Sequence, residues 1–175
     1  MSDLLDLFQP LQSIPLPVVV MRLVLAVGLG ALIGWEREIS ARAAGLRTHM
    51  LISLAAAMFT IVAMELTHFP AGGSDTLQID PLRLIEAVTA GVAFLAAGSI
   101  IFSGGSVRGV TTGASMWLAG AVGLASGTGD GLLAVMGTAL AVVILWMVRI
   151  ISTPAHEKHR GKAPAERPPA TRDDR

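Results

Sequence analysis

Two ionisable residues lie inside long apolar runs of the sequence: Arg22 near the start of one run and Glu86 near the start of another. An ionisable side chain within a membrane is costly, and it normally faces the bundle interior and pairs with another polar group. Small residues follow at helical spacing, Ala and Gly after Arg22 and Ala alone after Glu86, which lets two helices approach closely. The pattern predicts an Arg22–Glu86 contact, which either fixes helix register or serves function. A local pair of Glu86 with Arg83, one turn earlier, is the alternative.

Three carboxylates fall near the ends of apolar runs: Glu65, Asp80 and Glu86. Hard cations such as Mg²⁺ prefer oxygen ligands, so these residues are the candidates for a cation or proton site. The chain has no cysteine, which excludes thiolate metal ligands and cysteine nucleophiles. The sequence also lacks the Lys-Ser/Thr ending of a phosphate-binding loop and a nucleophile–base–acid set. We therefore expect neither an enzyme nor a resident cofactor.

A dense charge patch, GWEREISARAAGLRTHM over residues 34–50, separates two apolar runs. Its three arginines would hold a loop in the cytoplasm, but its two glutamates contribute nothing to that rule. The glutamates therefore indicate specific pairing, although exposed ion pairs worth about 0–1 kcal/mol each are the simpler alternative. We expect one cytoplasmic cluster with a functional role, made of Glu36, Arg37, Arg47 and the segment Arg108–Thr112. Thr111 and Thr112 would cap the helix that follows and favour a carboxylate beside its N–H groups.

The elements that must position these residues are membrane helices. The sequence is 53% hydrophobic and 15% charged, whereas soluble domains carry about 25% charged residues. Five apolar segments approach the length of about 20 residues that crosses the hydrocarbon core. They cover residues 16–35, 48–66, 82–102, 109–127 and 131–151. The sequence thus predicts an all-α membrane protein, a bundle of about five transmembrane helices.

The distribution of positive charge predicts the orientation of these spans. Most Lys and Arg residues fall in the patch 34–50, at Arg108 and in the last residues of the chain. Cytoplasmic loops carry the excess of positive charge, so the N-terminus is expected outside and the C-terminus in the cytoplasm. Residues 1–15 would form a short external N-terminus and 16–151 the membrane domain. Residues 152–175, rich in Pro, Lys and Arg, are expected to be a disordered basic cytoplasmic tail.

Four sequence blocks in order resemble the membrane domain of the bacterial MgtC/SapB family: GALIGWERE, GLRTHMLISLAAAMFT, DPLRLIEAVTAGVAFLAAGSI and VRGVTTGASMW. The resemblance covers about residues 20–127. The matching residues are Gly34, Glu36, Arg37, Gly45, Leu46, Arg47, Thr48, Asp80, Pro81, Arg83, Gly91, Phe94, Leu95, Gly98, Gly109, Thr111, Thr112 and Trp117. The chain departs from the family at Ala93 and Ala97, where glycine is more usual. Many members continue into a soluble C-terminal domain, and we expect the membrane domain alone here.

The resemblance implies a multi-pass protein of the bacterial inner membrane with a regulatory or interaction role. The family is linked to adaptation to low magnesium, to survival inside host cells and hence virulence, and to modulation of the ATP synthase or the membrane potential. The expected partners are the lipid bilayer, other membrane complexes such as ATP synthase, and further copies of the chain, but not nucleic acid. The alternative is a small transporter or channel for Mg²⁺, another cation or protons, because intramembrane charges often mark ion pathways.

Overall fold

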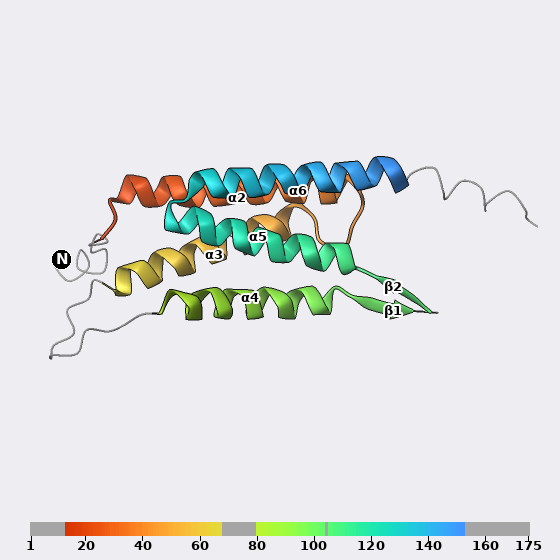
Figure 1. Ribbon diagram of the computed structural model, residues 1–175, viewed down its shortest axis with the longest axis horizontal. Helices are drawn as coiled ribbons and strands as arrows, with labels where there is room; N and C mark the ends of the chain where they lie inside the picture. The colour runs from red at the N-terminus through yellow and green to blue at the C-terminus, as the bar shows by residue number, and fades with distance from the viewer. Residues whose placement is uncertain (1–12, 68–79, 104, 153–175) are drawn as a thin grey trace, which may run out of the picture.

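The computed structural model describes residues 13–67, 80–103 and 105–152. Five long helices and one short β-hairpin make up this part of the chain (Figure 1). The helices are α2 (Leu16–Ile39), α3 (Leu46–Leu66), α4 (Pro81–Gly98), α5 (Val110–Thr128) and α6 (Gly131–Ser152). The hairpin joins β1 (Ile101–Ser103) to antiparallel β2 (Ser106–Arg108) between α4 and α5. The predicted bundle of about five helices is confirmed, while the predicted tail and most of the external N-terminus lie outside the described residues.

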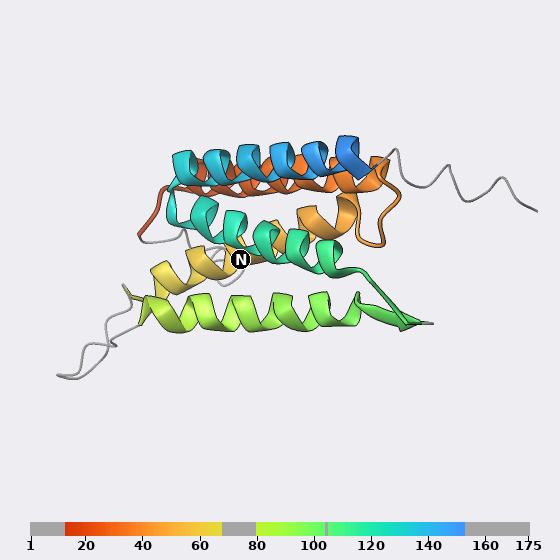
Figure 2. The same ribbon diagram turned by 45° about the vertical axis from the view of Figure 1, so that its right-hand side comes forward.

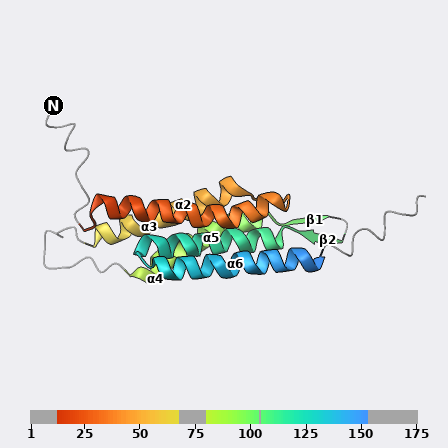
Figure 3. The same cartoon turned by 90° about the horizontal axis from the view of Figure 1, so that it is seen from above.

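The helices run back and forth along one long axis. One end of the bundle, which we call the loop end, holds residues 40–45, the hairpin and the C-terminal end of α6 (Figures 1 and 3). The start of α2 and the α5–α6 turn lie at the opposite end. α5 is central, because it packs against each of the other four helices. α4 forms an outer layer on α5 and, more lightly, on α3, so those two helices separate it from α2 (Figure 2).

Three of the helices, α2, α3 and α6, are long and apolar enough to cross a membrane by themselves. α4 and α5 are shorter, with 18 and 19 residues, or roughly 27 and 28 Å at 1.5 Å per residue. α5 is also less apolar, because Gly, Ser and Thr supply nine of its 19 residues. Its central position explains this composition, since small residues at helix interfaces let backbones approach.

Glycine pairs on α2 and α5 hold both helices tightly against α3. A Cβ atom on Gly30 would lie 2.7 Å from the His49 carbonyl oxygen, and one on Gly127 would lie 2.8 Å from the Ala57 carbonyl oxygen. Gly34 and Gly123 are equally close to α3 and stand four residues from Gly30 and Gly127 respectively. Residues four apart lie on one helix face, so each pair forms a flat strip that a side chain would disrupt.

Several boundaries differ from the predicted ones. α2 continues through the charge patch to Ile39, so the patch begins as helix rather than loop. The third span ends at Gly98, and the hairpin takes the chain from there to α5. α5 begins after Gly109, whose φ of 92° is left-handed and whose added Cβ would strike the Ser99 carbonyl oxygen. Thr112 therefore lies within the first turn of α5, and the predicted side-chain cap is wrong.

Candidate functional site: a buried polar cluster

Arg37 is the centre of a buried polar cluster at the loop end. Its side chain is only 4% exposed, although arginine is seldom buried without a partner. The Nη2 group donates a hydrogen bond of 3.2 Å to the Thr112 hydroxyl on α5. Because these residues are 75 positions apart in sequence, the bond ties the last turn of α2 to the first turn of α5. The structure thus brings together Arg37 and Thr112, two of the residues predicted to share a cluster.

Glu36 lies beside Arg37 and is itself 7% exposed. One carboxylate oxygen accepts a 2.8 Å hydrogen bond from the Ser40 hydroxyl, and the other lies 4.0 Å from Arg37 Nη1. That second oxygen and Arg37 Nε have no hydrogen-bond partner among the described residues. Buried polar groups are nearly always hydrogen-bonded, and a buried charge is costly unless its pairing is close. The pair thus retains capacity for a further partner.

His49 extends the cluster onto α3. The imidazole is fully buried, with Nδ1 2.8 Å from the Gly45 carbonyl oxygen and Nε2 3.0 Å from Ser115 Oγ. The carbonyl can only accept, so Nδ1 carries a proton, and in the neutral imidazole Nε2 then accepts a hydrogen bond from Ser115. Ser115 Oγ also lies 2.9 Å from the Thr112 carbonyl oxygen. The Ser115 hydroxyl has one proton, so it donates either to His49 Nε2 or to the Thr112 carbonyl oxygen. The cluster therefore has two possible hydrogen-bond arrangements.

We define the polar cluster as Glu36, Arg37, His49, Thr112 and Ser115. Its members come from α2, α3 and α5, so it joins three helices at one end of the bundle. The sequence-based interpretation did not include Ser115 or His49. A signal for it exists: His49, Ser53 and Thr60 recur at helical spacing on α3, and all three are buried.

The remaining charges of the patch lie outside the cluster. Glu38 turns back to accept a 3.0 Å hydrogen bond from the Leu46 backbone N–H, so it caps the start of α3. Gly45 leaves room for that carboxylate, which would clash with a Cβ atom there. Arg47 and Arg108, which were predicted to share a cluster with Glu36 and Arg37, are exposed. α2 stays helical to Ile39, and its last turn directs the Arg37 side chain into the bundle. Arg47 and Arg108 lie outside α2, at the surface.

Two further predicted positions lie beside the cluster without joining it. Thr48 is half-buried and lines a polar surface hollow with Arg47 and Glu38. Thr111 is exposed, whereas its neighbour Thr112 is buried. Adjacent residues of a helix face different directions, so only the second threonine reaches Arg37.

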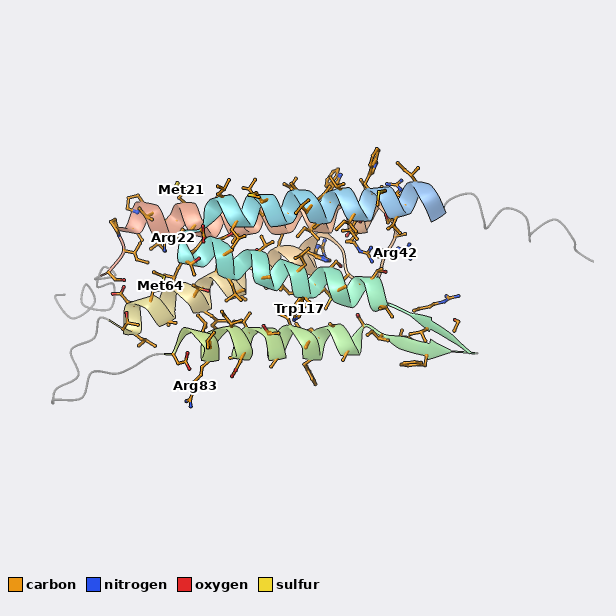
Figure 4. The ribbon with its side chains drawn as sticks, viewed as in Figure 1. Met21, Arg22, Arg42, Met64, Arg83 and Trp117 are labelled. Carbon is orange, nitrogen blue, oxygen red and sulfur yellow. The ribbon has the colours of Figure 1, made fainter. Side chains whose placement is uncertain are left out.

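The predicted Arg22–Glu86 contact is wrong. Arg22 Nη1 donates a 2.9 Å hydrogen bond to the Gly127 carbonyl oxygen on α5, and it lies 3.9 Å from Met64 Sδ on α3 (Figure 4). Glu86 is exposed on α4, on the other side of α3 and α5. The physical reason is the order of the helices: α5, not α4, packs beside α2. The charge of Arg22 meets a backbone carbonyl dipole near the end of α5 instead of a carboxylate.

The proposed cation ligands are not brought together. Asp80 caps α4 by accepting a 2.9 Å hydrogen bond from the Leu82 N–H. Glu65 accepts hydrogen bonds from the backbone and hydroxyl groups of Ser13, while Glu86 is exposed. Within residues 13–67, 80–103 and 105–152, no group of three or more His, Asp or Glu side chains could hold a metal ion. The predicted site of Glu86, Glu65 and Asp80 is therefore not assembled in this part of the chain.

The other predicted residues lie on or against α4. Arg83 is exposed and points away from the bundle (Figure 4). Gly91 and Gly98 are exposed, and a Cβ atom on either would meet nothing within 4 Å. Trp117 on α5 is 51% exposed and lines a small hollow between α4 and α5.

Comparison of the sequence with known proteins shows its family. The pattern of the MgtC family matches residues 23–153. The chain is 34% identical over 131 residues to the putative magnesium transporter YhiD of Escherichia coli (strain K12), covering 72% of this chain and 58% of YhiD. It is 37% identical over 115 residues to SapB of Bacillus subtilis (strain 168), covering 65% of this chain and 49% of SapB.

Protein MgtC of Salmonella typhimurium (strain LT2) is similar as well, at 36% identity over 111 residues, which cover 63% of this chain and 44% of MgtC. The chain thus spans about half the length of the curated relatives it matches. No solved structure matches it. The family match and the helices long enough to span a membrane together identify the chain as a multi-pass inner-membrane protein that belongs to the MgtC family.

Proposed function

We propose that this protein is a regulatory membrane protein that acts through contacts with other membrane complexes during adaptation to low magnesium. The observation that carries the proposal is the polar cluster, in which Arg37 reaches from α2 to Thr112 on α5. Burying an arginine beside a carboxylate is a poor way to gain stability, since desolvation offsets most of the attraction. We therefore infer that the cluster is a contact between helices that switches between two arrangements, and that its role is not only to stabilise the fold.

The cluster lies where a partner could act on it. The loop 40–45 follows α2 directly after Glu36 and Arg37, and the hairpin leads into α5 just before Thr112. A protein that binds either segment would shift one half of the Arg37–Thr112 contact against the other. The Ser115 hydroxyl can rotate between two acceptors, His49 Nε2 and the Thr112 carbonyl oxygen, so this donor stays paired in either arrangement.

The charge pattern supports a cytoplasmic location for the loop end. Arg42, Arg47, Arg108 and Arg149 all lie towards that end. Positive residues near the ends of spans are enriched on the cytoplasmic side, so we place the N-terminus outside and the C-terminus inside. The polar cluster would then face cytoplasmic partners. The family resemblance implies that the protein acts on ATP synthase, on the membrane potential and on survival inside host cells.

Transport of Mg²⁺, another cation or protons is the second candidate function. Its support is the similarity to YhiD, which is described as a putative magnesium transporter. Two features of the described residues favour regulation over transport. The carboxylates Glu65, Asp80 and Glu86 are dispersed, and no group of three or more His, Asp or Glu side chains among the described residues could hold a metal ion.

The test uses a deletion strain grown at limiting magnesium and complemented with variants of equal membrane abundance. Arg37→Gln should fail to restore growth, because Thr112 loses its charged donor and Glu36 its neighbour. Arg42→Gln, which removes an exposed arginine from the same patch, should restore growth fully. Full rescue by Arg37→Gln would contradict the proposal.

A second measurement separates regulation from transport. Purified protein in liposomes loaded with a Mg²⁺-sensitive dye, and in parallel with a pH-sensitive dye, should show no flux above protein-free vesicles. Flux that requires Arg37 would favour the transporter, and growth and flux lost together in Arg37→Gln would establish it.

A further inference from the structure

A groove runs between α2 and α6 along the side of the bundle. Its volume is about 520 Å³, within the range of roughly 300–1,000 Å³ that small-molecule sites occupy. Apolar side chains such as Leu29, Leu32, Val135 and Val142 form its walls. A groove of this kind within a membrane accepts an extended hydrocarbon chain. The apolar walls alone do not say which molecule supplies the chain.

The loop end of the groove carries opposite charges. Glu36 from α2 and Arg149 from α6 both line it there. Trp35 and Trp146 stand beside them, 60% and 59% exposed. Tryptophan gathers at the membrane–water interface, so this end lies at the level of the lipid headgroups. A ligand with its chain in the groove would therefore place its headgroup against one carboxylate and one guanidinium.

The carboxylate has acceptor capacity to spare. An ionised glutamate offers about four acceptor positions, and Glu36 receives one hydrogen bond from Ser40. Arg37 Nη1, at 4.0 Å, is too far to add a second. Among the described residues Glu36 Oε2 has no hydrogen-bond partner, and a buried carboxylate oxygen calls for one. The missing donors must be positively charged or neutral N–H or O–H groups, because the acceptor is an anion.

We propose that the groove binds one phospholipid with a primary ammonium headgroup, such as phosphatidylethanolamine. The ammonium donates hydrogen bonds to Glu36, the phosphate lies against Arg149, and one acyl chain follows the apolar walls. Arginine suits phosphate because its guanidinium presents several donors in a plane. Phosphatidylcholine carries the same charges but no N–H donor, and phosphatidylglycerol carries no cation. Neither satisfies the carboxylate.

Native mass spectrometry of the full chain tests this directly. Protein purified in a mild detergent is supplied separately with phosphatidylethanolamine, phosphatidylcholine and phosphatidylglycerol of identical acyl chains. One phosphatidylethanolamine should be retained about tenfold more strongly than either of the others, the difference that a hydrogen bond to a charged group typically makes. Equal retention of the ethanolamine and choline lipids would overturn the ammonium assignment.

Two matched variants test the location. Ala139 lines the groove, whereas its neighbour Leu140 is 63% exposed outside it. Ala139→Phe should abolish selective retention by filling the groove, and Leu140→Phe should leave it unchanged. Loss in both variants, or in neither, would overturn the groove as the site. Glu36→Gln should reduce the preference for the ethanolamine over the choline lipid towards one; an unchanged preference would show that Glu36 is not the acceptor.

Discussion

The packing of α5 against α3 makes a sharp prediction for Gly123→Ala. An added Cβ atom on Gly123 would fall on the Ser53 carbonyl oxygen and lie 2.8 Å from the Ala56 Cβ atom. Neither neighbour can rotate away, because one is helix backbone and the other is fixed to it. The two helices must therefore separate. Inserting one carbon into a well-packed interface typically costs about 1–3 kcal/mol, and we expect the upper part of that range here.

Gly91→Ala on α4 is the matched control. Nothing lies within 4 Å of the added Cβ atom there. Alanine favours a helix interior over glycine by roughly 0.5–1 kcal/mol, so this variant should be stabilised or unchanged. The two variants are chemically identical, and their free energies of unfolding should differ by about 1.5–4 kcal/mol.

The assay is reversible unfolding in mixtures of a mild detergent and SDS, followed by helical circular dichroism. Equal free energies of unfolding for Gly123→Ala and Gly91→Ala would refute the packing described for α3 and α5. Destabilisation by Gly91→Ala alone would do so as well, since it would place α4 rather than α5 at the centre of the bundle.

Three other predictions address the charges, the histidine and the topology. Arg22→Leu should lower the free energy of unfolding by about 1–3 kcal/mol, and Glu86→Leu by less than about 0.5 kcal/mol. The two effects should add in the double variant. Strong coupling between them would show that Arg22 and Glu86 are in contact after all. His49→Phe should cost about 1–3 kcal/mol in the same assay, because the Gly45 carbonyl and Ser115 lose their partner; wild-type stability would contradict its burial. In intact cells, Ala43→Cys should resist a membrane-impermeant thiol reagent that labels Thr128→Cys; the reverse pattern would invert the orientation.

The length of apolar runs was enough to predict the five helices. Each run approaches the thickness of a membrane, and the glycine-rich turns at Gly109 and Gly129 separate the later ones. Depth in the membrane also follows from position along a helix, which made Arg22 and Glu86 a plausible pair. Which helix lies beside which does not follow from depth. Five helices can be arranged in several orders, and here α5 takes the place beside α2 that the prediction gave to α4.

The polar cluster was predictable in part, because Arg37 and Thr112 belong to two sequence blocks that were predicted to face the same side. The pairing of Arg37 with the start of α5 came from that reasoning. The roles of Glu36, Glu38 and Arg47 did not, since they depend on where α2 ends. An extra turn of helix beyond residue 35 turns Glu36 and Arg37 inward and frees Glu38 to cap α3. Helix ends in charged segments are the least determined by sequence pattern.

The central claim is that the Arg37–Thr112 contact serves function and is not a by-product of topology. Thr112→Val tests it most directly, because it removes the hydroxyl that Arg37 binds, keeps the side-chain shape and changes no charge. The control is Thr111→Val at the exposed neighbouring position. At matched membrane abundance and limiting magnesium, Thr112→Val should fail to restore growth to a deletion strain while Thr111→Val restores it. Equal growth with both variants would contradict the account.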